Sequence, residues 1–206
     1  MYTLYYSPFA CSLAVHIVLE KVGNPFRLEK INIQKGDHKQ QVYETLNPRK
    51  KVPLLKHDNV FIDQGAAILI YLADLHPETA MIPPPGADER GAAISMLFYL
   101  SNTLHPAFSI AFHPERFTNG EFDELLTKAI EKIETILSEF NTQLANQDYL
   151  MGDHVYVTDY YLLTMLSWLP LFKRSLTCYP HLAEYQQRMA DFPEVKRAFE
   201  KEASQF

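Results

Sequence analysis

The chain has 206 residues, of which 47% are hydrophobic and 21% are charged, and this balance favours a packed core over disorder. A net charge of −6 without any basic block argues against a nucleic-acid-binding protein. The N-terminus lacks a signal-peptide pattern, and the longest apolar stretch, around residues 65–73, is too short to span a bilayer. We therefore expect a cytoplasmic protein with neither a membrane nor a nucleic acid as its partner.

The first part of the chain alternates short strands and helices. In chain order we expect a strand over residues 2–6, a helix over 12–22, a strand over 26–33, a poor helix or loop over 34–46, strands over 52–55 and 60–62, and a helix over 64–75. The order strand, helix, strand at the start predicts a parallel unit, and Asp58-Asn59 predicts a hairpin turn between the last two strands. The pattern therefore reads βαβαββα.

Strand signals nearly vanish after a segment rich in proline, residues 76–86, which is the best linker candidate. The expected helices that follow are 87–105, 121–144 and 157–169, with two more starting near Pro180 and Pro193. The predicted division is an α/β domain over residues 1–77, a linker over 78–87 and an all-α domain over 88–206.

Cys11 falls where the first strand ends and the first helix begins. Unpaired N–H groups at a helix N-terminus lower the pKa of a thiol, so this position predicts a thiolate, although most free cysteines are small buried hydrophobes. No Cys-x-x-Cys motif is present, so a thiol–disulfide step at Cys11 needs an external thiol. The second cysteine, Cys178, lies among apolar residues and is expected to be structural.

Three further positions each allow a functional and an ordinary interpretation. Pro53 is either a trans proline at a strand edge or part of a cis bond that presents the Val52 backbone to an extended peptide. Gln64-Gly65 either simply starts a helix or forms an anion site at its N-terminus. His105 is either a histidine without a chemical role or an acid–base group. No zinc motif, phosphate loop or dinucleotide fingerprint is present, so we expect no metal site.

Taken together, these positions resemble the cytosolic glutathione transferase family, most closely its bacterial beta class. The motifs that carry the resemblance are Leu4-Tyr5-Tyr6-Ser7-Pro8-x-Ala10-Cys11-Ser12-Leu13, Asn47-Pro48-x-x-x-Val52-Pro53, Gly65-x-Ala67-Ile68-x-x-Tyr71-Leu72-Ala73-Asp74, Leu104-His105 and Val157-x-Asp159-x-Tyr161-Leu162. The resemblance implies a thioredoxin-like N-terminal domain, an all-α C-terminal domain, a homodimer and glutathione as co-substrate.

The resemblance also implies roles for individual residues. The residues expected to take part in catalysis are Cys11, His105, Tyr5 and Ser12. Glutathione is expected to bind to Ala10, Lys35, Lys51, Val52, Pro53, Gln64 and Gly65. An electrophile between the domains is expected to contact Phe9, His113 and Trp168. Three departures from the family pattern stand out. Gln64 replaces a common glutamate, Pro106 replaces a common lysine, and Tyr156 occupies the place of a serine or threonine helix cap.

The implied activity is conjugation of glutathione to small hydrophobic electrophiles, a detoxification reaction. One alternative is a glutathione-dependent disulfide reductase that works through Cys11. A second alternative is a non-catalytic binding protein of the same fold, which the altered Gln64-Gly65 pair would favour.

Overall fold

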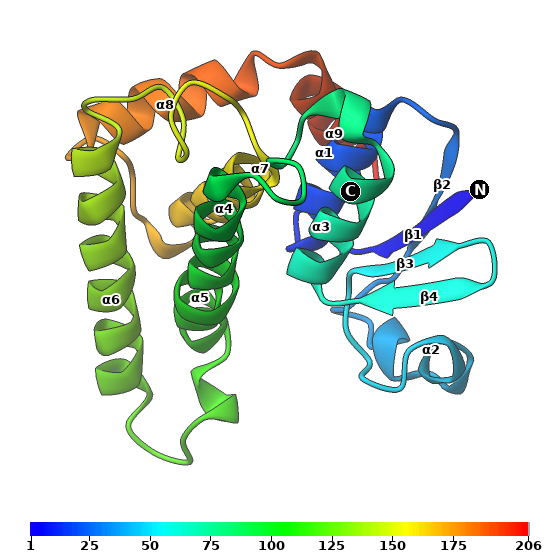
Figure 1. Cartoon of the computed structure of the whole chain (residues 1–206). Coiled ribbons are helices and arrows are strands. Elements are labelled where there is room, and N and C mark those ends of the chain that lie inside the picture. Colours follow the sequence, from blue (N-terminus) through cyan, green and yellow to red (C-terminus); the bar gives the residue numbers. More distant parts are fainter. Residues whose placement is uncertain (206) are drawn as a thin grey trace. The chain divides into compact units, whose positions relative to one another are not determined.

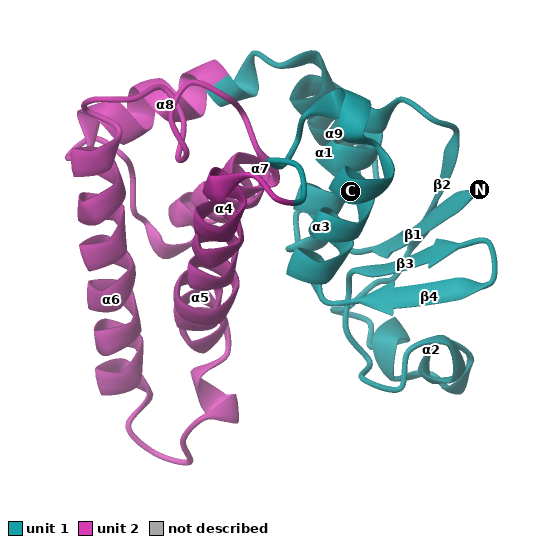
Figure 2. Ribbon diagram, in the orientation of Figure 1, with its two compact units in different colours: residues 1–85, 189–206 teal, residues 86–188 magenta. Residues whose placement is uncertain are grey.

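The computed structural model describes residues 1–205, and the chain divides into two compact units (Figure 2). Unit 1 consists of Met1–Pro85 together with the chain from Met189 onward, and unit 2 consists of Gly86–Arg188. The domains that the sequence predicts, over residues 1–77 and 88–206, follow the order of the chain, and this division stays a prediction. Compact packing instead groups the C-terminal helix with the N-terminal part of the chain.

Unit 1 is built on a four-stranded sheet in the order β2-β1-β3-β4 (Figure 1). Its elements are β1 (Tyr2–Tyr6), α1 (Ser12–Val22), β2 (Phe26–Lys30), the 3₁₀ turn η1 (Asp37–Lys39), α2 (Gln41–Leu46), β3 (Leu54–His57), β4 (Val60–Asp63), α3 (Gly65–Leu75), the 3₁₀ turn η2 (Pro77–Thr79) and α9 (Pro193–Ala203). Strands β1 and β2 are parallel, whereas β3 is antiparallel to both β1 and β4. The predicted βαβαββα order and the thioredoxin-like fold class are confirmed.

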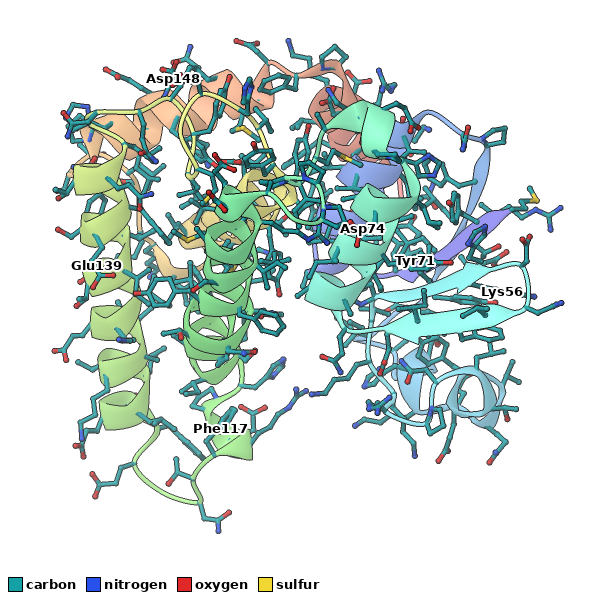
Figure 3. All side chains as sticks on the ribbon, in the orientation of Figure 1. Lys56, Tyr71, Asp74, Phe117, Glu139 and Asp148 are labelled. Atoms are coloured by element: carbon teal, nitrogen blue, oxygen red, sulfur yellow. The ribbon has the colours of Figure 1, made fainter. Side chains whose placement is uncertain are left out.

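Alternation along β1 assigns its side chains to two faces of the sheet. Tyr2, Leu4 and Tyr6 are buried, and the adjoining α1 is buried along most of its length. Tyr5 has the opposite orientation and packs with Tyr43 of α2, with ring centroids 6.0 Å apart. The hydroxyl of Tyr71 on α3, a residue labelled in Figure 3, lies 2.8 Å from Nδ1 of His57 on β3, which is an inner strand of the sheet.

Helix α9 is fastened to α1 by a cluster of charged groups. Arg197 Nε donates to Glu20 Oε2 at 2.8 Å, and Lys201 Nζ donates to the other oxygen of the same carboxylate. Burial raises the pKa of Glu20, but the hydrogen bonds from Lys201 and Arg197 outweigh burial and leave this pKa lower than usual. The Glu20 carboxylate is therefore held ionised between the two helices.

Unit 2 is helical. Its elements are α4 (Asp88–Tyr99), a π-helical segment η3 (Leu100–Leu104), α5 (His105–Phe112), the 3₁₀ turn η4 (Pro114–Arg116), α6 (Phe122–Gln143), α7 (Val157–Leu166) and the 3₁₀ turn η5 (Leu169–Phe172), and α8 (Pro180–Ala190) continues across the boundary into unit 1. The single helix expected over 87–105 thus has an α-helical part and a π-helical part. None of the helices among residues 1–205 combines the length and the apolar character that crossing a membrane requires.

The start of α7 is held by Asp159 rather than by a serine or threonine cap. Its carboxylate accepts hydrogen bonds from the backbone N–H groups of Leu150 and Tyr156, each at 2.9 Å, and from the Tyr185 hydroxyl at 3.0 Å. Complete burial raises the pKa of Asp159 to about 6 in spite of these donors. One acidic side chain thus joins the loop before α7, the helix start and α8.

Candidate functional site

The segment that leads from β1 into α1 places Cys11 directly before the first residue of that helix. The Cys11 thiol donates to the backbone oxygen of Val52, with Sγ and O 3.4 Å apart. These residues are 41 positions apart in sequence, and both belong to the predicted glutathione site. The fold therefore brings together a predicted catalytic residue and a predicted binding residue.

Val52 is held in a small apolar cluster on the α2 side of the sheet. It packs with Tyr43 and Leu54, and the partly buried side chains of Tyr5 and Ala10 join the same cluster. The Val52–Pro53 peptide bond is cis, which is the second of the two geometries considered from the sequence.

Two side chains fix the backbone immediately before Val52. The Tyr43 hydroxyl and the Asn47 amide nitrogen both donate to the backbone oxygen of Lys51, at 2.7 and 2.8 Å. Burial raises the pKa of Tyr43 to about 12, so its hydroxyl stays protonated and remains a donor. Neither residue is among the predicted site residues, although Asn47 belongs to the motif around Pro53.

The expected thiolate at Cys11 is wrong for this structure. Burial raises the pKa of the Cys11 thiol to about 11, and this effect outweighs the backbone N–H groups of Cys11 and Ser12 and the ammonium group of Lys51, which lower it. The residue keeps some exposure to solvent, whereas its sulfur lies deep among protein atoms. At neutral pH Cys11 is therefore a neutral thiol that donates a hydrogen bond.

The loop before Cys11 is closed by Ser12 and anchored by the C-terminal helix. Ser12 is fully buried, and its hydroxyl donates to the Ser7 oxygen at 3.1 Å and accepts from the Ser7 N–H at 3.2 Å. The N–H of Phe9 donates to Glu202 Oε2 at 2.6 Å, and Glu202 Oε1 lies 2.9 Å from Nδ1 of the buried His16. Phe9 itself has a left-handed backbone, with φ of 55°.

Sequence reasoning missed the pair formed by His16 and Glu202. A signal for His16 was available, because it is a titratable side chain in the middle of the apolar run over residues 12–22. Such a side chain in a buried helix needs a polar partner. The sequence alone gives no means of finding that partner 186 positions away.

The start of α3 carries two more of the predicted glutathione-binding residues, Gln64 and Gly65. Gln64 precedes the helix with φ of 70°, and its backbone oxygen accepts from the Ile68 N–H at 3.0 Å. Gln64 is exposed, as are Lys35 and Lys51. The first N–H groups of an α-helix of this length are available to an anion. The predicted roles of these residues stay predictions.

Unit 2 carries the remaining predicted residues. Nδ1 of His105 lies 2.7 Å from the Tyr161 hydroxyl, and the His105 ring lies beside that of Trp168, with centroids 5.5 Å apart. The Trp168 ring also contacts the ring of Phe112. His113 pairs with Glu115, with Nδ1 and Oε1 3.1 Å apart. His105 and Trp168 are thus neighbours within an aromatic cluster of this unit.

Cys178 is exposed, which corrects the expectation of a buried structural thiol. It lies in the turn that precedes Pro180 of α8 rather than within a helix, so no helical face covers it. Within residues 1–205 no group of three or more histidine, cysteine, aspartate or glutamate side chains is arranged to hold a metal ion.

Two family models match the chain: "Glutathione S-transferase, N-terminal domain" over residues 1–74 and "Glutathione S-transferase, C-terminal domain" over residues 99–193. The protein named glutathione S-transferase GstA from Escherichia coli O157:H7 is 34% identical over 205 residues, which cover 97% of this chain and 98% of that relative. The chain belongs to the glutathione S-transferase family.

Solved structures of other glutathione S-transferases have the same fold. A sphingomonad glutathione S-transferase complexed with glutathione is 32% identical, with a TM-score of 0.88 and 98% of each chain covered. The bacterial beta-class glutathione S-transferase of Sphingomonas chungbukensis is 33% identical, with a TM-score of 0.87, and the match covers 97% of this chain and 98% of that one. The resemblance to bacterial glutathione transferases is therefore confirmed, together with the fold class that it implies.

Proposed function

We propose that this chain is a glutathione transferase that joins glutathione to small hydrophobic electrophiles. The observation that carries the proposal is the 3.4 Å contact between the Cys11 thiol and the Val52 oxygen. It brings two motifs of the family pattern together in a chain that matches the family over nearly its full length. The sphingomonad relative forms a complex with glutathione, which supports the same ligand here.

Glutathione, in this proposal, lies along unit 1 as an extended peptide. Its cysteinyl backbone pairs with the Val52 backbone beside Pro53, as a strand pairs with a sheet edge. The γ-glutamyl end meets Gln64 and the N–H groups at the start of α3, which favour a carboxylate. The glycine carboxylate is met by the exposed side chains of Lys35 and Lys51.

The reaction forms one carbon–sulfur bond. The glutathione thiol loses its proton, and the resulting thiolate attacks an electrophilic carbon of the substrate. With an aryl halide, the carbon–halogen bond breaks and halide leaves with the bonding electron pair. The protein contributes by binding and orienting glutathione and by stabilising the charge on its sulfur.

Cys11 takes the role of a hydrogen-bond donor in this scheme, because burial keeps it protonated. In the proposed complex its S–H group turns from the Val52 oxygen to the glutathione sulfur. Tyr5 and Ser12 remain as proposed helpers, although the Ser12 hydroxyl already bonds to Ser7. The high pKa of Cys11 weighs against disulfide reduction through this residue, since thiol–disulfide exchange requires a thiolate.

His105 is proposed as an acid–base group for the reacting thiol. Phe9, His113 and Trp168 are proposed to contact the electrophile, and two copies of the chain are proposed to form a homodimer. Sedimentation velocity tests the homodimer directly, and a monomer at micromolar concentration would refute it.

The test of the proposed function is the conjugation of chlorodinitrobenzene, measured with the wild type and with Gln64→Ala. We expect glutathione-dependent turnover by the wild type. We expect the variant to show a higher KM for glutathione, by about tenfold for the loss of one ligand contact. Gln187→Ala, which changes an exposed glutamine of α8, is the matched control and should behave as wild type.

Absence of turnover with several aryl halides would refute the proposed transferase. Binding of glutathione without any turnover would favour the non-catalytic binding protein instead. Turnover only with disulfide substrates, lost in Cys11→Ala, would favour the reductase.

A further inference from the structure

One backbone oxygen beside the proposed glutathione site accepts hydrogen bonds from two buried side chains. The Tyr43 hydroxyl lies 2.7 Å, and the Asn47 amide nitrogen 2.8 Å, from the oxygen of Lys51. Because a carbonyl oxygen can only accept, the tyrosine must be the donor. The Asn47 side-chain oxygen accepts from the Arg49 N–H at 3.1 Å, so its nitrogen is the atom that faces Lys51. Both lone pairs of the Lys51 oxygen are thus used inside the protein.

The two donors are held together at the end of α2. Tyr43 is 3% exposed and Asn47 is 2% exposed, so water competes little for either hydrogen bond. The Asn47 N–H also bonds to the Tyr43 backbone oxygen at 2.8 Å, where α2 ends. The Tyr43 ring packs with Val52 and Leu54 in the apolar cluster of unit 1. Packing and hydrogen bonding therefore keep both side chains against the Lys51 oxygen.

The same contacts orient the N–H group that follows. The peptide bond between Lys51 and Val52 is trans, and the carbonyl and the N–H of a planar trans peptide unit point in opposite directions. Holding the Lys51 oxygen towards Tyr43 and Asn47 therefore directs the Val52 N–H away from these side chains. The Val52 oxygen in turn accepts from the Cys11 thiol at 3.4 Å. The Val52 backbone is thus held from α2 at one end and from Cys11 at the other.

We propose that Tyr43 is a positioning residue for glutathione. Its hydroxyl, together with the Asn47 amide, aims the Val52 N–H at the cysteinyl carbonyl of the ligand. Because the Lys51 oxygen has no lone pair left for the ligand, pairing falls to the Val52 backbone, which sets the register of the bound peptide. This inference rests on the proposed function, in which glutathione pairs with Val52 as a strand does. Tyr43 then affects how tightly glutathione binds and leaves the later bond formation unchanged.

The first test measures binding without chemistry, by calorimetry with S-methylglutathione, which has no thiol to ionise. Tyr43→Phe keeps the ring and removes the hydroxyl, and we expect it to raise the Kd about fivefold, as the loss of one neutral hydrogen bond predicts. Tyr2→Phe is the matched control, because it removes the hydroxyl of another buried tyrosine of unit 1, which lies 2.9 Å from Nε2 of His76. This control should bind as the wild type does.

A shorter ligand tests whether the effect acts through Val52. The Lys51 side chain is also proposed to meet the glycine carboxylate, so its displacement would weaken binding by a different route. γ-Glutamyl-S-methylcysteine lacks the glycine and keeps an acceptor oxygen on its cysteinyl residue. We expect Tyr43→Phe to weaken the binding of this ligand by the same factor of about five. A penalty limited to S-methylglutathione would assign the effect to Lys51 and overturn the inference.

Steady-state kinetics with chlorodinitrobenzene separate positioning from a loss of folded protein. In Tyr43→Phe the KM for glutathione should rise about fivefold while kcat stays within about twofold of the wild type. A merely destabilised enzyme would instead lose kcat in proportion to its unfolded fraction and keep its KM. Asn47→Ala removes the second donor and should move the KM in the same direction, and it replaces Tyr43→Phe if that variant does not fold.

An unchanged Kd in Tyr43→Phe, or an equal rise in Tyr2→Phe, would overturn the inference, as would a loss of kcat at an unchanged KM. Failure of the proposed function has a different signature in the wild type. Binding of S-methylglutathione without turnover of any aryl halide would contradict the transferase alone. A wild type that does not bind S-methylglutathione at millimolar concentration would contradict both proposals.

Discussion

At the scale of single residues, the protonation state of the Cys11 thiol determines which chemistry this residue can perform. Burial raises its pKa to about 11, although the helix N-terminus and Lys51 act in the opposite direction. An ordinary exposed thiol has a pKa near 8.5, so at neutral pH Cys11 holds roughly 300-fold less thiolate than an unperturbed cysteine. The residue is suited to donating a hydrogen bond and poorly suited to attacking a disulfide.

This difference predicts the alkylation pattern of the two cysteines. With a limiting amount of iodoacetamide at about pH 7.5, the exposed Cys178 should react at least about 100-fold faster than Cys11. The rate at Cys11 should increase as the pH approaches 11, because its thiolate then becomes populated. Peptide mapping by mass spectrometry measures both rates in one sample.

Reaction at Cys178 serves as the internal control, because it shows that the reagent alkylates an exposed thiol in the same sample. Preferential alkylation of Cys11 at neutral pH would contradict the neutral thiol and would restore the disulfide reductase as a serious alternative.

At the residue scale, sequence could identify Cys11 as important but could not give the direction of its pKa shift. The helix N-terminus is a local feature and is visible in the sequence. Burial depends on residues such as Val52, far away in the chain, and it proves to be the larger effect.

At the scale of elements, the start of α7 depends on one buried carboxylate. Asp159 accepts two backbone hydrogen bonds and one from Tyr185, while burial raises its pKa to about 6. An unfolded aspartate titrates near pH 3.9, so between about pH 4 and pH 6 the folded protein holds a proton here that the unfolded chain has released. The contribution of Asp159 to stability therefore falls as the pH rises through that window.

Asp159→Asn should destabilise the protein by about 1–3 kcal/mol, because an amide cannot accept from both backbone donors. The difference in the free energy of unfolding between the wild type and Asp159→Asn should be larger at about pH 5 than at about pH 7.5, since only the wild type loses stability as Asp159 ionises. Urea denaturation at the two pH values measures it, with the exposed Asp153→Asn as the control. A penalty that grew with pH would contradict the raised pKa.

The elements themselves could be predicted where their signals are local. The strand over residues 2–6 and the helix over 12–22 have the predicted bounds, because aromatic alternation and an apolar run specify them directly. The π-helical segment could not be predicted, because helix continues on both sides of it. Its one sequence signal is Pro106, whose effect depends on helix already formed upstream.

For the whole molecule, the notable connection is between the two ends of the chain. Helix α9 packs on α1 through Glu20, Arg197 and Lys201, and Glu202 of the same helix reaches the N–H of Phe9. The C-terminal helix therefore supports the loop that leads to Cys11.

Glu20→Gln should loosen this connection, because Arg197 and Lys201 lose the carboxylate that they share. We expect faster amide hydrogen exchange over residues 193–203 and in the loop around Phe9, and a loss of about 1–3 kcal/mol in stability. Glu200→Gln, an exposed substitution on the same helix, should leave exchange unchanged. Slow exchange retained in Glu20→Gln would show that apolar packing alone holds α9.

Sequence could not predict that α9 joins unit 1. Its apolar stripe predicts a helix that packs against something, but the choice of α1 depends on charged pairs separated by about 180 positions in the chain. Chain order instead suggested that residues 88–206 form one helical domain.

The ionisation of glutathione bound to the protein, followed by ultraviolet difference spectroscopy as the pH is varied, is the decisive measurement for the proposed transferase. If unit 1 binds glutathione and stabilises the charge on its sulfur, the bound thiol should ionise at least about one pH unit below an ordinary thiol, whose pKa is near 8.5. A bound thiol that ionises no earlier than free glutathione, or a protein that does not take up glutathione at millimolar concentration, would contradict this mechanism.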